Sequence, residues 1–437
     1  VIGGGPAGTW AAISAAAQGA NVVLADKGYC GASGATAPSG TAVWYVEPDR
    51  QKREEAKASR YARGGYLAED VWMNRVLEQT WTNMQTLADW GYPFPLDSDG
   101  QQQRISLQGP EYMRLMRKRV KQAGVRILDH SPALQLLTDS EGRVSGASGF
   151  SRQKHLEWKV EAAAVVIATG GCAFLSRALG CNVLTGDGHL MAAEVGADFS
   201  GMEFSNAYGL CPAFSSVTKS ALYKWAVFYH ADGRVMEGAG SAQGRGVIAK
   251  ALQTEAVFAR LEKADATVQA QMRLAQPNFF LSFDRLGIDP FKQLFPVTLR
   301  LEGTVRGTGG LRIVDEQCAT SVPGLYAAGD AATRELICGA FTGGGSHNAA
   351  WALSSGFWAG AGAAQFALGN RLAGSIHLRA QGRAGLLDAR GQRVDSGALI
   401  KAVQDEVFPY QRNWFRHGDD LQASLCLLYT SPSPRDR

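Results

Sequence analysis

The first residues of the chain form a glycine-rich turn that restricts what can follow it. Gly3, Gly5 and Gly8 are spaced as GxGxxG, after the apolar pair Val1-Ile2 and before an alanine-rich stretch. In a strand–turn–helix unit, the first glycine permits the tight turn and the third lets the helix pack closely on the sheet. The pattern predicts a helix from Pro6 to Gln18, ended by Gly19.

The second glycine of this turn points to a ligand, because a residue without a side chain lets the backbone approach a pyrophosphate. A second buried strand is predicted over residues 21–25, and Asp26 follows it. Asp26 lies 23 positions beyond Gly3 (26 − 3), near the roughly 20 expected for an acceptor of a ribose hydroxyl. We therefore predict that a dinucleotide binds here, with these contact residues: Gly3, Gly5, Pro6, Ala7, Gly8, Asp26 and Lys27.

Two later segments repeat the pattern of a buried strand ending in a small-residue turn. They are Ala168-Thr169-Gly170-Gly171 and Gly324-Leu325-Tyr326-Ala327-Ala328-Gly329-Asp330. Ligands bind at the carboxyl ends of strands in an α/β sheet, so Asp330 can accept from a sugar hydroxyl. Together, the first turn and these two segments indicate that the dinucleotide is FAD. Further contacts with FAD are expected from Ser33, Gly34, Thr36, Ala168, Thr169, Gly170, Asp187, Gly329, Asn348 and Ala349. For Asp187, capping of a helix over 189–195 by Thr185 or Asp187 is the alternative to ligand contact.

The order of patterns along the chain predicts an α/β fold. Helices are expected over 49–63, 70–90 and 111–122, and strands over 125–128, 134–137, 144–150, 163–168 and 324–328. The regular alternation is lost from about 206 to 304, which suggests an inserted domain. A long helix is expected after the run Gly343-Gly344-Gly345-Ser346, and its positive end could stabilise the anionic reduced flavin.

Composition excludes several classes of protein. The net charge of +4 is too small to indicate nucleic-acid binding. Seven cysteines include no CxxC pair, so we expect no metal site and no iron–sulfur cluster in this chain. Residues 336–370 contain no Asp, Glu, Lys or Arg, but they are rich in glycine, so a buried helix is favoured over a membrane span. No signal peptide is visible, and we expect a cytoplasmic protein without a transmembrane segment.

Both ends of the chain look non-native. Only Val1 and Ile2 precede the glycines, whereas a strand usually has about five residues. Residues 426–437 resemble the translation of a sequencing adapter. We therefore expect a fragment that lacks both native ends.

The ordered motifs resemble the flavoprotein family of succinate dehydrogenase, fumarate reductase, L-aspartate oxidase and adenylylsulfate reductase. The resemblance covers about residues 1–365. Besides the segments above, its carriers are Thr185 to Gly188, Met202-Glu203-Phe204, Arg245 to Ile248 and Gly309-Gly310. It implies a Rossmann-like FAD-binding domain (1–205 and 305–365), an inserted α+β capping domain (206–304), and the start of a helical C-terminal domain (366–425), followed by the non-native tail (426–437).

The resemblance implies an FAD-dependent oxidoreductase whose catalytic residue is Arg245, the first residue of an RDxxxR-like segment. A free guanidinium is a poor acid, so this role requires a dry site; otherwise Arg245 is an anion clamp. The loop 31–36 has no histidine, so FAD is expected to bind without a covalent link.

The family's anchors for a dicarboxylate are missing. Residues 206–209 replace a QxHP-like tetrad, residues 304–308 contain no histidine, and Phe341-Thr342 replaces an arginine segment. A small, anionic substrate other than a standard C4-dicarboxylate is therefore expected. Residues that could line a changed pocket are Tyr208, Arg306, Arg334 and His347, each with a structural role as the alternative.

Electrons would leave to an iron–sulfur partner, to oxygen or to a quinone. An electron-relay or structural FAD-binding subunit without substrate chemistry is the main alternative. A pyridine-nucleotide–disulfide reductase is disfavoured, because the chain has neither the cysteine pair nor a second GxGxxG.

Overall fold

Parallel strands form the sheet that carries the glycine-rich turn. β1 (Val23–Ala25) pairs with β4 (Arg126–Leu128), and β15 (Leu325–Ala327) pairs with β8 (Val165–Ile167). Ile2 joins the two pairs through parallel bridges to Ala25 and Ile167. The order β4, β1, Ile2, β8, β15 confirms the predicted α/β class.

The structure is a computed structural model that describes residues 1–32, 34–96, 99–218, 220–241, 244–342, 345–370, 377–382 and 395–430. The chain divides into two units. Unit 1 comprises residues 1–174, 183–207 and 303–389, and unit 2 comprises residues 175–182, 208–302 and 390–437. The domain bounds expected from the sequence stay a prediction.

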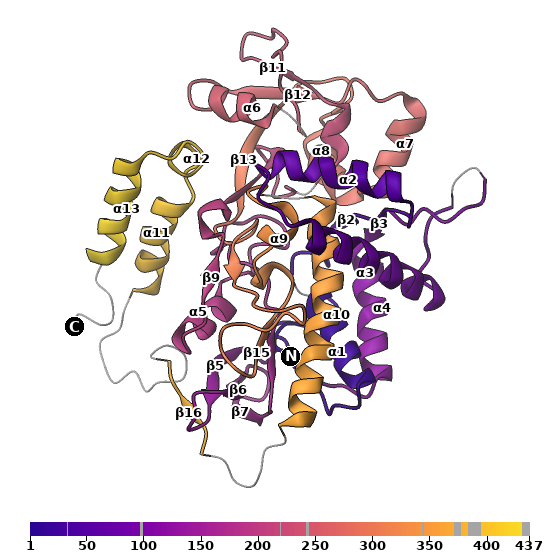
Figure 1. The fold of residues 1–437 in the computed structure, drawn as a ribbon. Coiled ribbons are helices and arrows are strands. Elements are labelled where there is room, and N and C mark those ends of the chain that lie inside the picture. The colour runs from indigo at the N-terminus through magenta and orange to yellow at the C-terminus, as the bar shows by residue number, and fades with distance from the viewer. Residues whose placement is uncertain are drawn as a thin grey trace. The chain divides into compact units, whose positions relative to one another are not determined.

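Two helices of small residues pack tightly in unit 1. α1 (Pro6–Ala17) and α10 (Ser346–Gly369) lie side by side (Figure 1). A Cβ on Gly356 would lie 2.4 Å from the carbonyl oxygen of Ala7, and one on Gly360 would lie 2.2 Å from that of Ala11. The glycines of α10 therefore serve close helix packing.

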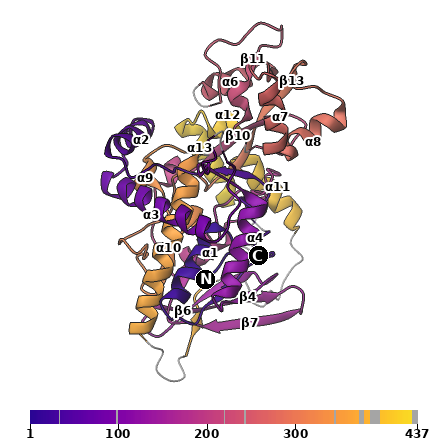
Figure 2. The ribbon, with the colours of Figure 1, turned by 90° about the vertical axis from the view of Figure 1, so that its right-hand side faces the viewer.

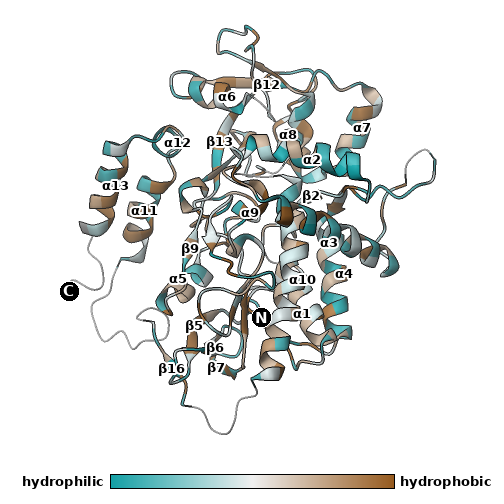
Figure 3. Ribbon diagram, viewed as in Figure 1, coloured by the Kyte–Doolittle hydropathy of each residue, from teal (hydrophilic) through white to brown (hydrophobic). Residues whose placement is uncertain are grey.

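α4 (Gly109–Gln122) lies beside α1 (Figure 2), and the Trp10 indole donates a 2.8 Å hydrogen bond to the Tyr112 hydroxyl. The other helices of unit 1 are α2 (Arg50–Arg63), α3 (Asp70–Asp89), α5 (Asp187–Glu194) and α9 (Glu335–Cys338), with short 3₁₀ turns at Met202–Phe204 and Gly329–Ala331. The polar sequence of α2 contrasts with the apolar α1 and α10 (Figure 3).

Antiparallel strands complete unit 1. Their order is β16 (Arg379–Ala380), β5 (Ala133–Thr138), β6 (Val144–Ser151), β7 (Leu156–Glu161). Two further pairs are β2 (Gly40–Ala42) with β3 (Ser106–Gln108), and β9 (Phe199–Ser200) with β14 (Gly310–Leu311). The predicted hairpin and the predicted helices of residues 49–122 are confirmed, and Asp49 caps α2 by accepting from the N–H of Lys52.

Unit 2 contains a four-stranded sheet of order β10 (Ala207–Pro212), β13 (Phe295–Gly303), β12 (Val257–Arg260), β11 (Val227–Tyr229). Its helices are α6 (Arg245–Ala251), α7 (Ala266–Ala275), α8 (Pro277–Leu286), α11 (Ser396–Val407), α12 (Tyr410–Asn413) and α13 (Gly418–Thr430), with a 3₁₀ turn at Leu222–Trp225. Its core contains the buried rings of Phe279, Phe280, Phe283 and Phe295.

Within the described residues, none of the helices combines the length and the apolar character that crossing a membrane would require. The expected non-native tail falls partly on α13, and residues 431–437 lie outside the described residues.

Candidate FAD site

The three glycines of the first turn have different structural roles. Gly3 has a φ of +104°, and a Cβ there would lie 2.3 Å from the Ala168 carbonyl oxygen. A Cβ on Gly8 would lie 1.8 Å from the Gly3 carbonyl oxygen. A Cβ on Gly5 would meet no protein atom within 4 Å. The chain itself therefore requires Gly3 and Gly8, whereas Gly5 leaves open space beside the backbone.

The start of α1 is arranged to receive an anion. Gly5 is the N-cap and makes no side-chain cap bond, and Pro6 occupies the first turn. The first N–H groups of a helix have no intrahelical acceptor, and the helix dipole places positive charge there. Ala7 can contribute only its backbone, because its methyl group is buried beside Gly329. Such an end is suited to the phosphates of a dinucleotide.

Asp26 is buried directly beside this turn. Its Oδ2 accepts a 2.6 Å hydrogen bond from the N–H of Gly4, and its Oδ1 accepts a 2.6 Å hydrogen bond from the N–H of Gly28. The side chain is 5% exposed. The carboxylate thus fixes the end of β1 to the glycine turn, at the place predicted for a ribose contact.

Lys27 and Asp187, both expected to contact the cofactor, contact each other. The Lys27 ammonium donates to Thr185 Oγ1 at 2.6 Å and to Asp187 Oδ2 at 3.1 Å. Thr185 Oγ1 in turn donates to Asp187 Oδ2 at 2.6 Å. The predicted capping of α5 by Thr185 or Asp187 is wrong. The helix begins at Asp187, its N-cap is Gly186 with a φ of +79°, and no side chain caps it, because Asp187 lies one position past the N-cap.

The turn after β8 presents a polar atom without a protein partner. Ala168 is buried against Gly3 and Gly8, and Gly170 has a φ of +74° that turns the chain away. Among the described residues, the buried hydroxyl of Thr169 has no hydrogen-bond partner. Buried polar groups are normally satisfied, so a polar ligand atom fits this place.

Asp330, at the end of β15, is held by two buried arginines. Arg334 Nη1 lies 3.1 Å from Asp330 Oδ1, and Arg306 Nε lies 3.7 Å from Asp330 Oδ2. Gly329 has a φ of +66°, and its carbonyl accepts a 3.1 Å hydrogen bond from the Trp351 indole. The sequence singled out Arg306 and Arg334 as residues of a changed pocket, whereas the structure pairs both with a carboxylate.

The remaining expected contacts are spread over two segments of unit 1. Asn348 and Ala349 belong to the first turn of α10. Gly34 has a φ of +87°, and a Cβ there would meet nothing within 4 Å. Thr36 lies in the same turn-rich segment. Ser33, Gly343 and Gly344 lie outside the described residues.

Arg245 is the first residue of α6, in unit 2. Its guanidinium donates to the Tyr208 carbonyl at 3.2 Å and to the Ser241 carbonyl at 2.8 Å. Burial lowers the pKa of Arg245, and the charge of Glu302 partly opposes this change. Nε is buried without a partner among the described residues. This is a partly desolvated guanidinium held by neutral backbone groups.

The sequence suggested that His347 and Tyr208 line a substrate pocket. In the structure, both side chains are buried. His347 is 0% exposed and Tyr208 is 5% exposed. Burial raises the pKa of Tyr208 well above its usual value, with the charge of Arg416 acting in the opposite direction, so the phenol stays protonated.

The residues of unit 1 fit FAD. The uncapped start of α1, the open side of Gly5, the acceptor Asp26 and the unpartnered Thr169 hydroxyl supply the phosphate and polar contacts that a dinucleotide needs.

Comparisons with known proteins agree with an FAD site in unit 1. Residues 1–208 match the family model described as the FAD binding domain. The chain is 30% identical over 247 residues to L-aspartate oxidase of Streptomyces coelicolor, a match that covers 51% of this chain and 41% of that protein. It is 26% identical over 237 residues to a probable fumarate reductase of Shewanella frigidimarina, covering 48% and 40%. The matched region thus spans about two fifths of each relative.

Solved structures share the fold. A quinol fumarate reductase of E. coli superposes with a TM-score of 0.71 and 22% identity, covering 93% of this chain and 74% of that chain. Adenylylsulfate reductase from Archaeoglobus fulgidus gives a TM-score of 0.68 and 19% identity, covering 84% and 69%. Residues 1–208 therefore match the FAD binding domain family, FAD is the cofactor, and about half of the chain is similar to L-aspartate oxidase and to a probable fumarate reductase.

Proposed function

We propose that this protein is an FAD-dependent oxidoreductase that moves a hydride between the flavin and a small anionic substrate. The observation that carries the proposal is the FAD-binding unit together with Arg245, a guanidinium desolvated on neutral backbone carbonyls. When bound, FAD supplies the two-electron chemistry.

Arg245 would hold or move the proton of the reaction. Its pKa is lowered by burial, which makes proton release easier than from a solvated guanidinium. The Tyr208 and Ser241 carbonyls fix its orientation without neutralising its charge. The unpartnered Nε leaves it a donor for an anionic group.

The substrate would differ from a standard C4-dicarboxylate. Tyr208 stands in the segment where the resembling family has a substrate-binding histidine. Because its phenol remains protonated, it is a neutral hydrogen-bond donor and supplies no positive charge for a second carboxylate. A substrate with one anionic group fits this balance better than one with two.

Electrons would reach an external partner, for which an iron–sulfur protein is the first candidate. The described residues contain no group of three or more His, Cys, Asp or Glu side chains that could hold a metal ion.

The test is flavin reduction by candidate substrates under anaerobic conditions, with Arg245→Lys and Arg245→Gln compared with the wild type. We expect both changes to lower turnover by about 100-fold or more, with FAD retained. Arg234→Gln is the matched control, because Arg234 is an arginine of the same unit whose side chain is 79% exposed. Unchanged turnover in both Arg245 variants would remove the catalytic role.

A relay or structural subunit is the second candidate, favoured by the missing dicarboxylate anchors. It predicts tight FAD binding with no small molecule that reduces the flavin. This alternative would be favoured if a reduced iron–sulfur protein reduces the flavin while none of a panel of organic acids does.

A further inference from the structure

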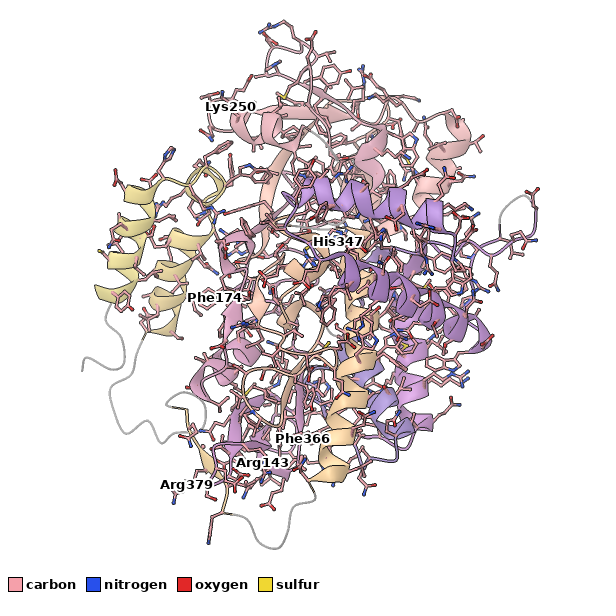
Figure 4. The ribbon with its side chains drawn as sticks, viewed as in Figure 1. Arg143, Phe174, Lys250, His347, Phe366 and Arg379 are labelled. Carbon is pink, nitrogen blue, oxygen red and sulfur yellow. The ribbon has the colours of Figure 1, made fainter. Side chains whose placement is uncertain are left out.

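The first turn of α10 contains a buried histidine without a polar partner. His347 is 0% exposed, and neither ring nitrogen has a hydrogen-bond partner among the described residues. Its ring lies against Phe341, with centroids 5.2 Å apart. Figure 4 labels His347 in unit 1.

Arginines from two other elements surround this position. Arg60, on α2, donates a 3.0 Å hydrogen bond to Ser346 Oγ, at the first residue of α10, and lies 5.7 Å from the Trp44 ring. Arg63, one turn further along α2, lies 5.9 Å from the Phe341 ring. Arg334, before α9, is 1% exposed.

The electrostatic effect of these arginines reaches His347. Burial lowers the pKa of His347 well below its usual value, and the charges of Arg334, Arg60 and Arg63 lower it further. Burial also lowers the pKa of Arg60, and Arg63 adds to the effect. His347 is therefore neutral, and the local positive charge belongs to the arginines.

This positive charge is incompletely neutralised. Arg334 pairs with Asp330 at 3.1 Å, so the charge in question is that of Arg60 and Arg63. In the part of the chain that the structure describes, no carboxylate lies within ion-pair distance of Arg60 or Arg63, and the hydrogen-bond acceptor of Arg60 is a serine hydroxyl. The start of a 24-residue helix adds positive potential at the same place.

We propose that Arg60 and Arg63 are positioning residues that set the reduction potential of FAD, by stabilising negative charge at the start of α10. Two-electron reduction with uptake of one proton leaves a negative charge on the flavin ring, near N1. The inference rests on FAD binding and on the predicted contacts of Asn348 and Ala349. It does not depend on the identity of the substrate, so it stands or falls separately from the proposed reaction.

The affinity for sulfite gives a second measure of how well negative charge on the flavin ring is stabilised. The sulfur lone pair of sulfite forms a bond to flavin N5, the ring accepts that electron pair, and the resulting adduct carries the added negative charge on the ring. No oxidant or reductant is required. Positive potential at the start of α10 should therefore strengthen sulfite binding and raise the potential together.

The test uses the holoprotein and compares Arg60→Gln with Arg60→Lys. Arg114→Gln is the matched control, because Arg114 is an arginine of unit 1 with a 77% exposed side chain. Midpoint potentials are measured by equilibration with a reference dye, and sulfite affinity by loss of the oxidised flavin absorbance. We expect Arg60→Gln to weaken sulfite binding about tenfold and to lower the potential by about 30 mV, the equivalent for a two-electron couple.

Arg60→Lys should recover most of both values, because it keeps the charge, and Arg114→Gln should change neither. A purely structural role for Arg60 would lower the unfolding temperature without moving the potential, and that result overturns the inference. If Arg60→Gln loses FAD, Arg63→Gln decides the question, because Arg63 is exposed on α2 and, among the described residues, makes no hydrogen bond to α10. Unchanged potential and sulfite affinity in Arg63→Gln would then overturn it.

Discussion

The carboxylate of Asp26 accepts a 2.6 Å hydrogen bond from the backbone N–H of Gly4. The end of β1 is thus tied to the turn between Ile2 and α1, two segments that a ligand's pyrophosphate and ribose would touch in turn. One buried side chain therefore shapes the loop beside the predicted ribose contact.

Asp26→Asn should weaken FAD binding. An amide keeps one acceptor oxygen but places an N–H₂ donor against either Gly4 or Gly28, so a charge-assisted bond worth about 1.5–3 kcal/mol is lost. FAD affinity, measured by titrating the apoprotein and following flavin fluorescence, should fall at least about tenfold. Asp232→Asn, at a side chain that is 53% exposed in unit 2, should leave the affinity unchanged.

Gly5→Ala and Gly8→Ala should fail in different ways. A Cβ on Gly5 meets no protein atom within 4 Å, so the apoprotein should keep its unfolding temperature while FAD binding is lost to the new methyl group. A Cβ on Gly8 lies 1.8 Å from the Gly3 carbonyl oxygen, so this variant should be destabilised even without FAD. Gly369→Ala, also free of contacts, is the control for both. Undiminished FAD affinity in Gly5→Ala would contradict the placement of the ligand.

Asp330→Asn should destabilise unit 1. It removes the carboxylate that lies 3.1 Å from Arg334 and 3.7 Å from Arg306, two arginines that are 1% and 6% exposed. Breaking a buried ion pair by removing one partner costs about 3–5 kcal/mol. Urea unfolding of the apoprotein should show a loss of that size, whereas a loss below about 1 kcal/mol would mean that solvent or another group neutralises the arginines.

The Arg117–Asp129 ion pair should contribute to the free energy of unfolding of unit 1, and this contribution should be lost at low pH. Burial alone would raise the pKa of Asp129, but its hydrogen bonds from Arg117 and from the N–H of Cys30 lower it. A carboxyl whose folded pKa lies below the unfolded value of about 3.9 stabilises the protein above that pH, and this contribution is lost as the pH falls through the folded pKa.

Asp129→Asn should therefore be less stable than the wild type by about 1–3 kcal/mol at neutral pH, with the difference shrinking below about pH 4. Urea unfolding at several pH values measures it. Asp198→Asn, at a side chain that is 54% exposed, should show no such trend. A difference independent of pH would mean that packing, and not charge, carries the effect.

Much of the FAD site could be predicted because its signals are local. Glycine spacing predicts the turn of Gly3 to Gly8, since Gly3 has a φ of +104° and a Cβ on Gly8 would lie 1.8 Å from the Gly3 carbonyl oxygen of the same turn. Alternating strand and helix patterns predicted α2, α3 and the hairpin of β5 and β6, because each depends on periodicity within a short segment. Asp26 was found by its distance from Gly3 along the chain.

Other features required the tertiary structure, because they depend on partners distant in sequence. No pattern near Lys27 shows that it reaches Thr185 and Asp187. Nor does the sequence bring Arg60 to Ser346, 286 positions away. The sequence by itself determined the turns that hold a dinucleotide, because backbone sterics act locally; only tertiary packing decided which buried charges are paired, because ion pairs form between elements that the chain order does not make neighbours.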